Sequence, residues 1–290
     1  MPLLLFPLAL AANLAAAPAP PRLLLQTATF RSLDQTQKTG EVEVSATVPT
    51  QPLVYRQRAP KSFQSSAVVD LSILKADGAV AWQETVQLKP PVLNDTTVAI
   101  KNPVSFLKRV TLPDGTYTLR GRIRDQYRAQ GGEVTVEQTL VVAAPKGPAF
   151  SDILFLVKPA AKAPTGQGAF NRGGYLLARA PGGHYGRGAD GLYFYTELNQ
   201  LPAGRPVLLH YHLAAPDGAA ADADAPPLTV LGGRPTPVTG QLPLAILPDG
   251  PFTLTIEARD GATKKLLATQ HQDGERNTTE YAPGGAVVPR

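Results

Sequence analysis

The stretch LPDGTYTLRGRIRD at residues 112–125 nearly recurs as LPDGPFTLTIEARD at residues 247–260, and the two copies share eight of fourteen residues. They begin 135 residues apart. That distance is much longer than the period of about 20–50 residues found in solenoid repeats, and it is close to the length of one domain. The repeat therefore predicts two copies of one fold within a chain of 290 residues.

Each copy is predicted to be a β-strand that follows a tight turn. Proline presets φ and glycine permits positive φ, so the shared Pro-Asp-Gly is typical of a turn. Apolar and polar residues then alternate, with Tyr117 and Phe252 opening the apolar sides and Arg124 and Arg259 closing the polar sides. This alternation predicts a half-buried antiparallel strand, and a second alternating run after each copy completes a hairpin. Tyr117 also stands where immunoglobulin-like domains place a corner tyrosine, whose hydroxyl Phe252 lacks.

The similarity extends upstream, because VVDLSILKADG at 68–78 matches VLLHYHLAAPDG at 207–218. The 29 prolines and 26 glycines favour many turns between short elements, and no segment shows a convincing helical stripe outside the N-terminus. We therefore predict an all-β protein of two tandem immunoglobulin-like antiparallel β-sandwiches. Within the second, residues 214–227 are predicted to form a low-complexity loop. The predicted units are a signal peptide at 1–19, a first sandwich at 23–144, a second sandwich at 150–272 and a flexible tail at 273–290.

The N-terminal sequence MPLLLFPLALAANLAAAPAP predicts export. An apolar stretch of about 15 residues is followed by Ala-x-Ala cleavage patterns, which is the plan of a signal peptide. An uncleaved segment held at a membrane is the alternative. The absence of cysteine excludes disulfides, thiol catalysis and cysteine-ligated zinc. We expect the protein in the periplasm, at the cell surface or outside a bacterial cell.

The charge distribution argues against nucleic acid as a partner. The net charge is +5, but no run of five or six basic residues occurs. The expected partner is instead a protein or a glycan of the cell envelope.

Several segments, in order, resemble the N-terminal half of bacterial GWxTD-domain proteins. They are FRSLDQ and GEVEVSATVPTQPLVYRQ within 30–57, VVDLSILKADG, LPDGTYTLRGRIRD, FSDILFLV at 150–157 and NRGGYLLARAPGGHYGRGADGLYFYTEL at 171–198. The resemblance covers roughly residues 25–270 and implies two immunoglobulin-like domains in an exported protein. The Gly-Trp-x-Thr-Asp segment that names the family does not occur in this sequence, whose single tryptophan is Trp82.

The sequence holds no motif for nucleophilic catalysis, zinc proteolysis or phosphate-loop chemistry. We predict a non-enzymatic binding or structural module with no cofactor. The alternative is a metal-dependent or carboxylate hydrolase that uses loop aspartates and three histidines, His184, His210 and His212.

His210 and His212 share one face of a predicted strand, which could place two imidazoles on a metal ion. Their neighbour Tyr211 belongs to the apolar face, so we expect both histidines to face solvent. The nearby loop carries three carboxylates that could offer oxygen ligands to calcium, Asp217, Asp222 and Asp224.

An arginine ladder is one candidate binding surface. Arg120, Arg122 and Arg124 fall on one face of the repeated strand, and Arg56 and Arg58 could lie near them. Such a ladder could bind a polyanionic glycan or lipid head groups. The other interpretation is a solvated strand face that discourages edge-to-edge association.

A second candidate combines aromatic residues with a glycine-rich loop. Tyr193 and Tyr195 share a face with Glu197, as in surfaces that bind sugars or proteins. The opposite face is only slightly more apolar, so the sequence leaves open which face is buried. The loop at residues 179–191 is the candidate contact loop through its two central residues, His184 and Tyr185.

Overall fold

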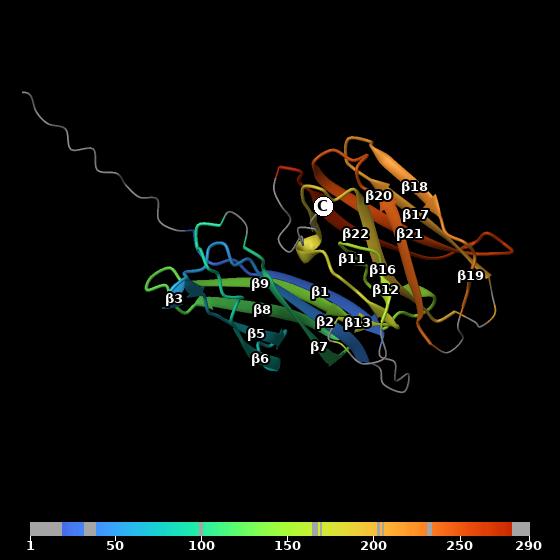
Figure 1. The fold of residues 1–290 in the computed structure, drawn as a ribbon. Coiled ribbons are helices and arrows are strands. Elements are labelled where there is room, and N and C mark those ends of the chain that lie inside the picture. The colour runs from blue at the N-terminus through green and yellow to red at the C-terminus, as the bar shows by residue number, and fades with distance from the viewer. Residues whose placement is uncertain are drawn as a thin grey trace, which may run out of the picture.

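The computed structural model describes residues 19–31, 39–98, 101–163, 168, 170–201, 204, 206–230 and 234–279. The predicted signal peptide therefore lies almost wholly outside the described residues. The described elements are strands and one short 3-10 turn, η1 (Pro181–Gly183), which confirms the all-β prediction. Figure 1 shows two β-sandwiches, one from each half of the chain. No helix in this described part is long and apolar enough to cross a lipid bilayer.

The first sandwich packs two antiparallel sheets around an aliphatic core in which Val44 and Leu119 are fully buried. One sheet has the order β1 (Leu24–Arg31), β2 (Thr39–Val48) and β7 (Val104–Pro113). The other has the order β6 (Val80–Leu88), β5 (Ala67–Lys75), β8 (Gly115–Asp125) and β9 (Glu133–Val142). A hairpin of β3 (Arg56–Ala59) and β4 (Ser62–Gln64) stands at one end of this sandwich (Figure 1).

The second sandwich has its own core, in which Phe194 and Leu254 are fully buried. One sheet centres on β16 (Gly191–Asn199), which pairs with β10 (Ala149–Phe150), β11 (Leu154–Leu156) and β20 (Thr236–Pro243). The larger sheet has the order β15 (His184–Tyr185), β22 (Leu266–Arg276), β21 (Gly250–Asp260), β17 (Pro206–Ala214) and β18 (Ala220–Asp224), and β19 (Leu228–Thr229) also pairs with β17. A small separate sheet contains β12 (Ala161–Lys162), β14 (Tyr175–Leu176) and β13 (Asn171–Arg172).

The repeated stretch occupies the same place in both sandwiches, as predicted. β8 lies between β5 and β9, and β21 lies between β17 and β22. Tyr117 and Phe252 are both buried, while Arg124 is exposed and Arg259 is partly exposed. The Tyr117 hydroxyl donates a hydrogen bond to the carbonyl oxygen of Pro113 at 3.0 Å. This bond has the form of a tyrosine corner, and Phe252 cannot make it.

The predicted start of the tail at residue 273 is wrong, because β22 continues through Arg276. Gly274 pairs with Phe252 across the sheet. A Cβ at Gly274 would lie 2.5 Å from the Phe252 ring, so only glycine lets the strand pass over this core aromatic. The alternation of apolar side chains ends before this point, but the backbone pairing does not. The rest of the predicted tail, from residue 280, lies outside the described residues.

The predicted loop at 214–227 also needs correction, because it contains the strand β18. A turn with Gly218 at a φ of 94° reverses the chain, and β18 then pairs antiparallel with β17. Alanine and aspartate alternate in β18, so Ala221 faces the core while Asp222 faces solvent. The apolar positions of β18 are alanines, which give a weak alternation signal, so the segment has the composition of a loop although it forms a strand.

A fragment of the second sandwich is expected to fold alone because its core is self-contained. Residues 149–279 should be more stable than residues 150–272, since the shorter fragment loses the end of β22 and its pairing with β21 and β15. A loss of about 1 kcal/mol would lower the melting temperature by about 3–5 °C in a domain of roughly 130 residues. Thermal melting followed by circular dichroism measures the difference. Equal melting temperatures would show that residues 273–276 contribute nothing.

Candidate binding surfaces

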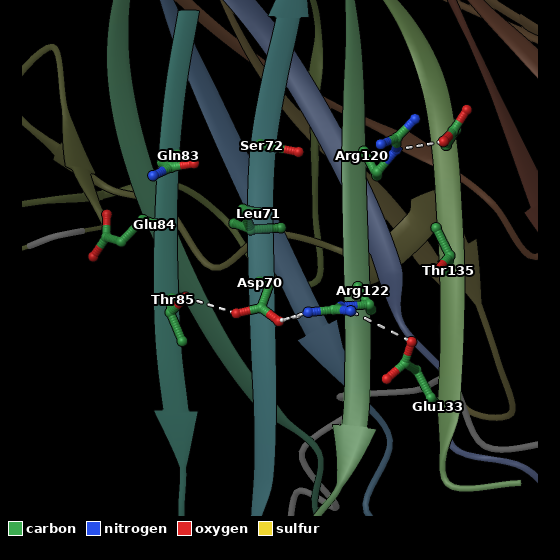
Figure 2. Close-up of a pocket in the computed structure, with 11 residues that line it drawn as sticks. Asp70, Leu71, Ser72, Gln83, Glu84, Thr85, Arg120, Arg122, Glu133 and Thr135 are labelled. Carbon is green, nitrogen blue, oxygen red and sulfur yellow. Dashed lines mark hydrogen bonds and ion pairs between the residues drawn. The ribbon is translucent and has the colours of Figure 1, made fainter. Parts of the chain in front are cut away.

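The outward face of the first sandwich's four-stranded sheet is hollowed and polar. The hollow has a volume of about 740 Å³. Figure 2 shows that its side chains come from all four strands of the sheet. They are mostly the outward residues that alternate with the core: Asp70, Ser72, Gln83, Thr85, Arg120, Arg122, Glu133, Thr135 and Glu137. Leu71 and Glu84, which are paired across β5 and β6 on the other side of the sheet, also contribute.

Hydrogen bonds across the strands hold the charged groups of this hollow in place. Asp70 lies between Thr85 and Arg122 (Figure 2), accepting a bond of 2.6 Å from the threonine hydroxyl and one of 2.9 Å from the guanidinium. The bond from Thr85, followed by that from Arg122, lowers the pKa of Asp70 below its ordinary value. Arg122 also lies 3.6 Å from a carboxylate oxygen of Glu133. The face is therefore a lattice of fixed charges of alternating sign.

The predicted arginine ladder exists, but most of its charge is compensated. Arg120, Arg122 and Arg124 all point outward from β8. Arg120 pairs with Glu137 on the neighbouring strand, and Arg122 pairs with Asp70. The first two arginines therefore belong to the mixed lattice rather than to a basic stripe.

The corresponding face of the second sandwich carries a hollow of about 500 Å³ that includes His210 and His212. Both histidines lie on the outward side of β17, as predicted. The Nδ1 atom of His210 lies 2.8 Å from Asp224, and that of His212 lies 2.8 Å from Asp222. The hydrogen bond to Asp224 raises the pKa of His210, which favours the charged imidazolium.

The structure does not assemble the residues of the hydrolase alternative. Within the described ranges, no group of three histidine, aspartate or glutamate side chains is arranged to hold a metal ion. His184 is on β15, three strands away from the strand of His210 and His212. At about 4.8 Å per strand, this separates them by roughly 14 Å. His184 is itself partly exposed and lies 3.1 Å from Glu275.

The predicted aromatic surface is wrong for Tyr195 and Tyr185, which are 0% and 2% exposed. β16 is buried on both faces, so the choice of face left open by the sequence has no single answer. Tyr195 packs toward the first sandwich, with its ring centroid 6.4 Å from that of Phe30. Tyr185 is held in the second core, where its hydroxyl donates to Leu156 at 3.0 Å. Tyr193, on the same side as Tyr195, is partly buried against the apolar cluster that contains Phe30 and Tyr195.

A buried cluster of charges joins the two sandwiches, and the sequence did not indicate it. We call it the junction cluster: Glu41, Glu43, Arg109, Arg172, Arg179 and Glu197. Arg172, with a side chain only 6% exposed, forms two bonds to Glu197, of 2.7 and 3.1 Å. Its remaining amino group pairs with Glu41 from the first sandwich, and its guanidinium stacks 3.6 Å from the centre of the Phe30 ring.

Two arginines of the junction cluster respond to burial in opposite ways, since burial lowers the pKa of Arg179 whereas neighbouring carboxylates outweigh burial at Arg172. Burial alone would lower the pKa of Arg172, but the charge and hydrogen bonds of Glu197, with help from Glu43 and Glu41, raise it above its ordinary value. Glu43 lies 3.0 Å from Arg109 and also pairs with Arg179. The cluster therefore binds the two sandwiches to each other through charges of which four have little access to water, those of Glu43, Arg172, Arg179 and Glu197.

No family model and no curated protein matches this sequence. Red sea bream transglutaminase is similar over 87% of this chain and 31% of its own, with 10% identity and a TM-score of 0.24. The tetra-tandem repeat in the extending region of a large adhesion protein is similar over 88% and 50%, with 13% identity and a TM-score of 0.25. For Bacteroides uniformis β-glucuronidase the shares are 84% and 27%, the identity 10% and the TM-score 0.32. The chain thus spans half or less of these proteins, and such low TM-scores carry no functional argument.

Proposed function

We propose that this chain is an exported, non-enzymatic module that binds another protein of the bacterial envelope through the hollowed face of β6, β5, β8 and β9. The observation that carries the proposal is the lattice of fixed charges in that hollow, which is open to solvent. A solvated face needs no such order, whereas a complementary partner does. The junction cluster supports the proposal, because it gives the module a fixed relative placement of its two sandwiches.

The lining of the hollow favours a protein over a neutral sugar. Sugars stack on exposed aromatic rings, and none of the described residues that line this hollow is aromatic. The tyrosines that could have served, Tyr193 and Tyr195, face the first sandwich instead. Acids and arginines alternate across the strands, so a matching surface must also alternate in sign. Protein surfaces meet that requirement, and mismatched partners are rejected by like charges.

Other features support export and argue against catalysis. The apolar N-terminal sequence has the plan of a signal peptide, and the absence of cysteine suits a bacterial exported protein. The order of strand motifs resembles the N-terminal half of GWxTD-domain proteins, and we propose a relationship to that half. The hydrolase alternative would use His184 together with His210. These residues are on β15 and β17, three strands apart in the sheet.

Photo-crosslinking in the native cells tests the proposed binding face. A photoreactive amino acid in place of Ser72, inside the hollow, should give one discrete adduct with a protein partner. The same amino acid in place of Lys162, on β12 in the second half of the chain, is the control and should give none. The Ser72 probe is then combined with Asp70→Arg and Arg122→Asp, which keeps an ion pair between these positions but reverses its polarity. The adduct should disappear, because the reversed charges no longer match those of the partner.

The polarity swap separates binding from folding, since the exchanged groups can still pair with each other. An adduct that persists unchanged in the swapped protein would disprove recognition by the charge lattice. No adduct from Ser72, with the protein correctly exported, would disprove the binding face itself.

A further inference from the structure

Another hollow lies at the end of the same sheet, beside the β3–β4 hairpin, and three of the arginines at it form no ion pair with the acids of the described residues. It has a volume of about 700 Å³ and is bordered by Arg56, Arg124 and Tyr127. The guanidinium carbons of Arg56 and Arg58 lie 4.6 and 5.2 Å from the centre of the Tyr127 ring. The side chain of Arg58 also donates a hydrogen bond to the Tyr127 hydroxyl. Two cations are therefore held on one ring, and a third, Arg124, borders the same hollow from the end of β8.

The acids near this end are committed to other groups. Asp125 is buried and accepts hydrogen bonds from the backbone of Val54 at 2.8 Å and of Tyr127 at 3.0 Å. It also lies 3.7 Å from Arg128. Glu133 borders the hollow but lies within 3.6 Å of Arg122 in the neighbouring lattice.

Among the described residues, no carboxylate lies within ion-pair distance of Arg56, Arg58 or Arg124. Arg120 and Arg122, on the same strand as Arg124, each have an acidic partner. Glu133 is the cross-strand partner of Arg124, but the two are not ion-paired, so the three guanidinium groups remain available to a bound anion. Guanidinium groups present planar forks that match carboxylate and phosphate groups bidentately.

We infer that this hollow binds an acidic oligosaccharide through its carboxylate or phosphate groups. Several separate cations favour a ligand with repeated negative charges. A concave border favours a discrete chain over a flat lipid surface. The rest of the lining is polar or small, namely Asp125, Gln126, Arg128, Ala129, Gly131, Gly132 and Glu133. These described residues offer no apolar recess for the side chains of a peptide. The site is distinct from the protein-binding face and does not depend on that proposal.

Titration calorimetry on the full chain at low salt tests the site. The probes are a hexamer of galacturonic acid, a hexamer of mannose 6-phosphate, neutral maltohexaose, hexaglutamate, and vesicles with anionic phosphatidylglycerol. At least one acidic hexamer should bind, maltohexaose should not, and higher salt should weaken binding because it screens charges. Arg56→Gln with Arg58→Gln should reduce the affinity about tenfold or more per guanidinium, the usual effect of losing a hydrogen bond to a charged group.

The control removes the same net charge elsewhere, through Lys75→Gln with Lys162→Gln, two exposed lysines away from the hollow. It should leave the affinity within about twofold, since long-range charge effects are screened. Equal losses in both double variants would show a general charge effect and overturn the site. So would binding of neither acidic hexamer, or tighter binding of hexaglutamate or of the vesicles. Circular dichroism of both variants confirms that they are folded.

Discussion

Replacing Arg172 with alanine should lower the free energy of unfolding by about 3–5 kcal/mol, the usual cost of removing one partner from a buried ion pair. The substitution leaves Glu197 buried without its bidentate partner and removes the link to Glu41. It also removes the cation that stacks on Phe30, between the two sandwiches. Scanning calorimetry should show one cooperative transition in the wild-type protein. In the variant, we expect a lower melting temperature and two separate transitions.

Two further variants test whether burial of the ion pair causes the large loss of stability expected for Arg172→Ala. Arg122→Ala breaks an ion pair on the exposed sheet face, and water screening should leave its melting curve close to that of the wild type. Arg172→Lys keeps the charge but loses the planar fork of the guanidinium. Its melting temperature should therefore lie between those of the wild type and of Arg172→Ala. If Arg172→Ala melts in a single transition at the wild-type temperature, the junction cluster does not couple the sandwiches.

The elements predictable from the sequence are those set by local chemistry. The Pro-Asp-Gly turn and the alternation after it placed Tyr117 and Phe252 in two cores, and the structure confirms both positions. The outward orientation of His210 and His212 followed from the same period of two. Where composition obscured the period, as in the alanine-aspartate run of β18, the prediction failed.

The junction between the sandwiches was not predictable, because it depends on contacts between residues far apart in the chain. Glu41 and Glu43 alternate with valines, a pattern that ordinarily places carboxylates in solvent. In the folded chain that side of β2 meets Arg172, 131 residues from Glu41. The same docking buries Tyr195, on a strand for which the sequence left open which face is buried. One signal was present in β16, where both faces were nearly equally apolar, as expected for a strand buried on both sides.

The other large effect on stability is expected at Tyr117 and Phe252, the equivalent aromatic residues of the two repeats. Tyr117→Ala should lower the stability of the first sandwich by about 3–5 kcal/mol, and Phe252→Ala should do the same in the second, the usual cost of emptying a buried aromatic site. Tyr117→Phe keeps the ring but removes the hydrogen bond to Pro113, so about 0.5–1.5 kcal/mol should be lost. In the Arg172→Ala background, where the sandwiches are expected to unfold separately, chemical denaturation followed by NMR signals from each sandwich assigns every loss to its own half. Because both side chains start the same strand behind the same turn, their alanine variants should differ by little, apart from the lost hydroxyl bond. A large loss from one alanine variant and almost none from the other would mean that the shared turn does not give the two aromatics equivalent roles in their cores.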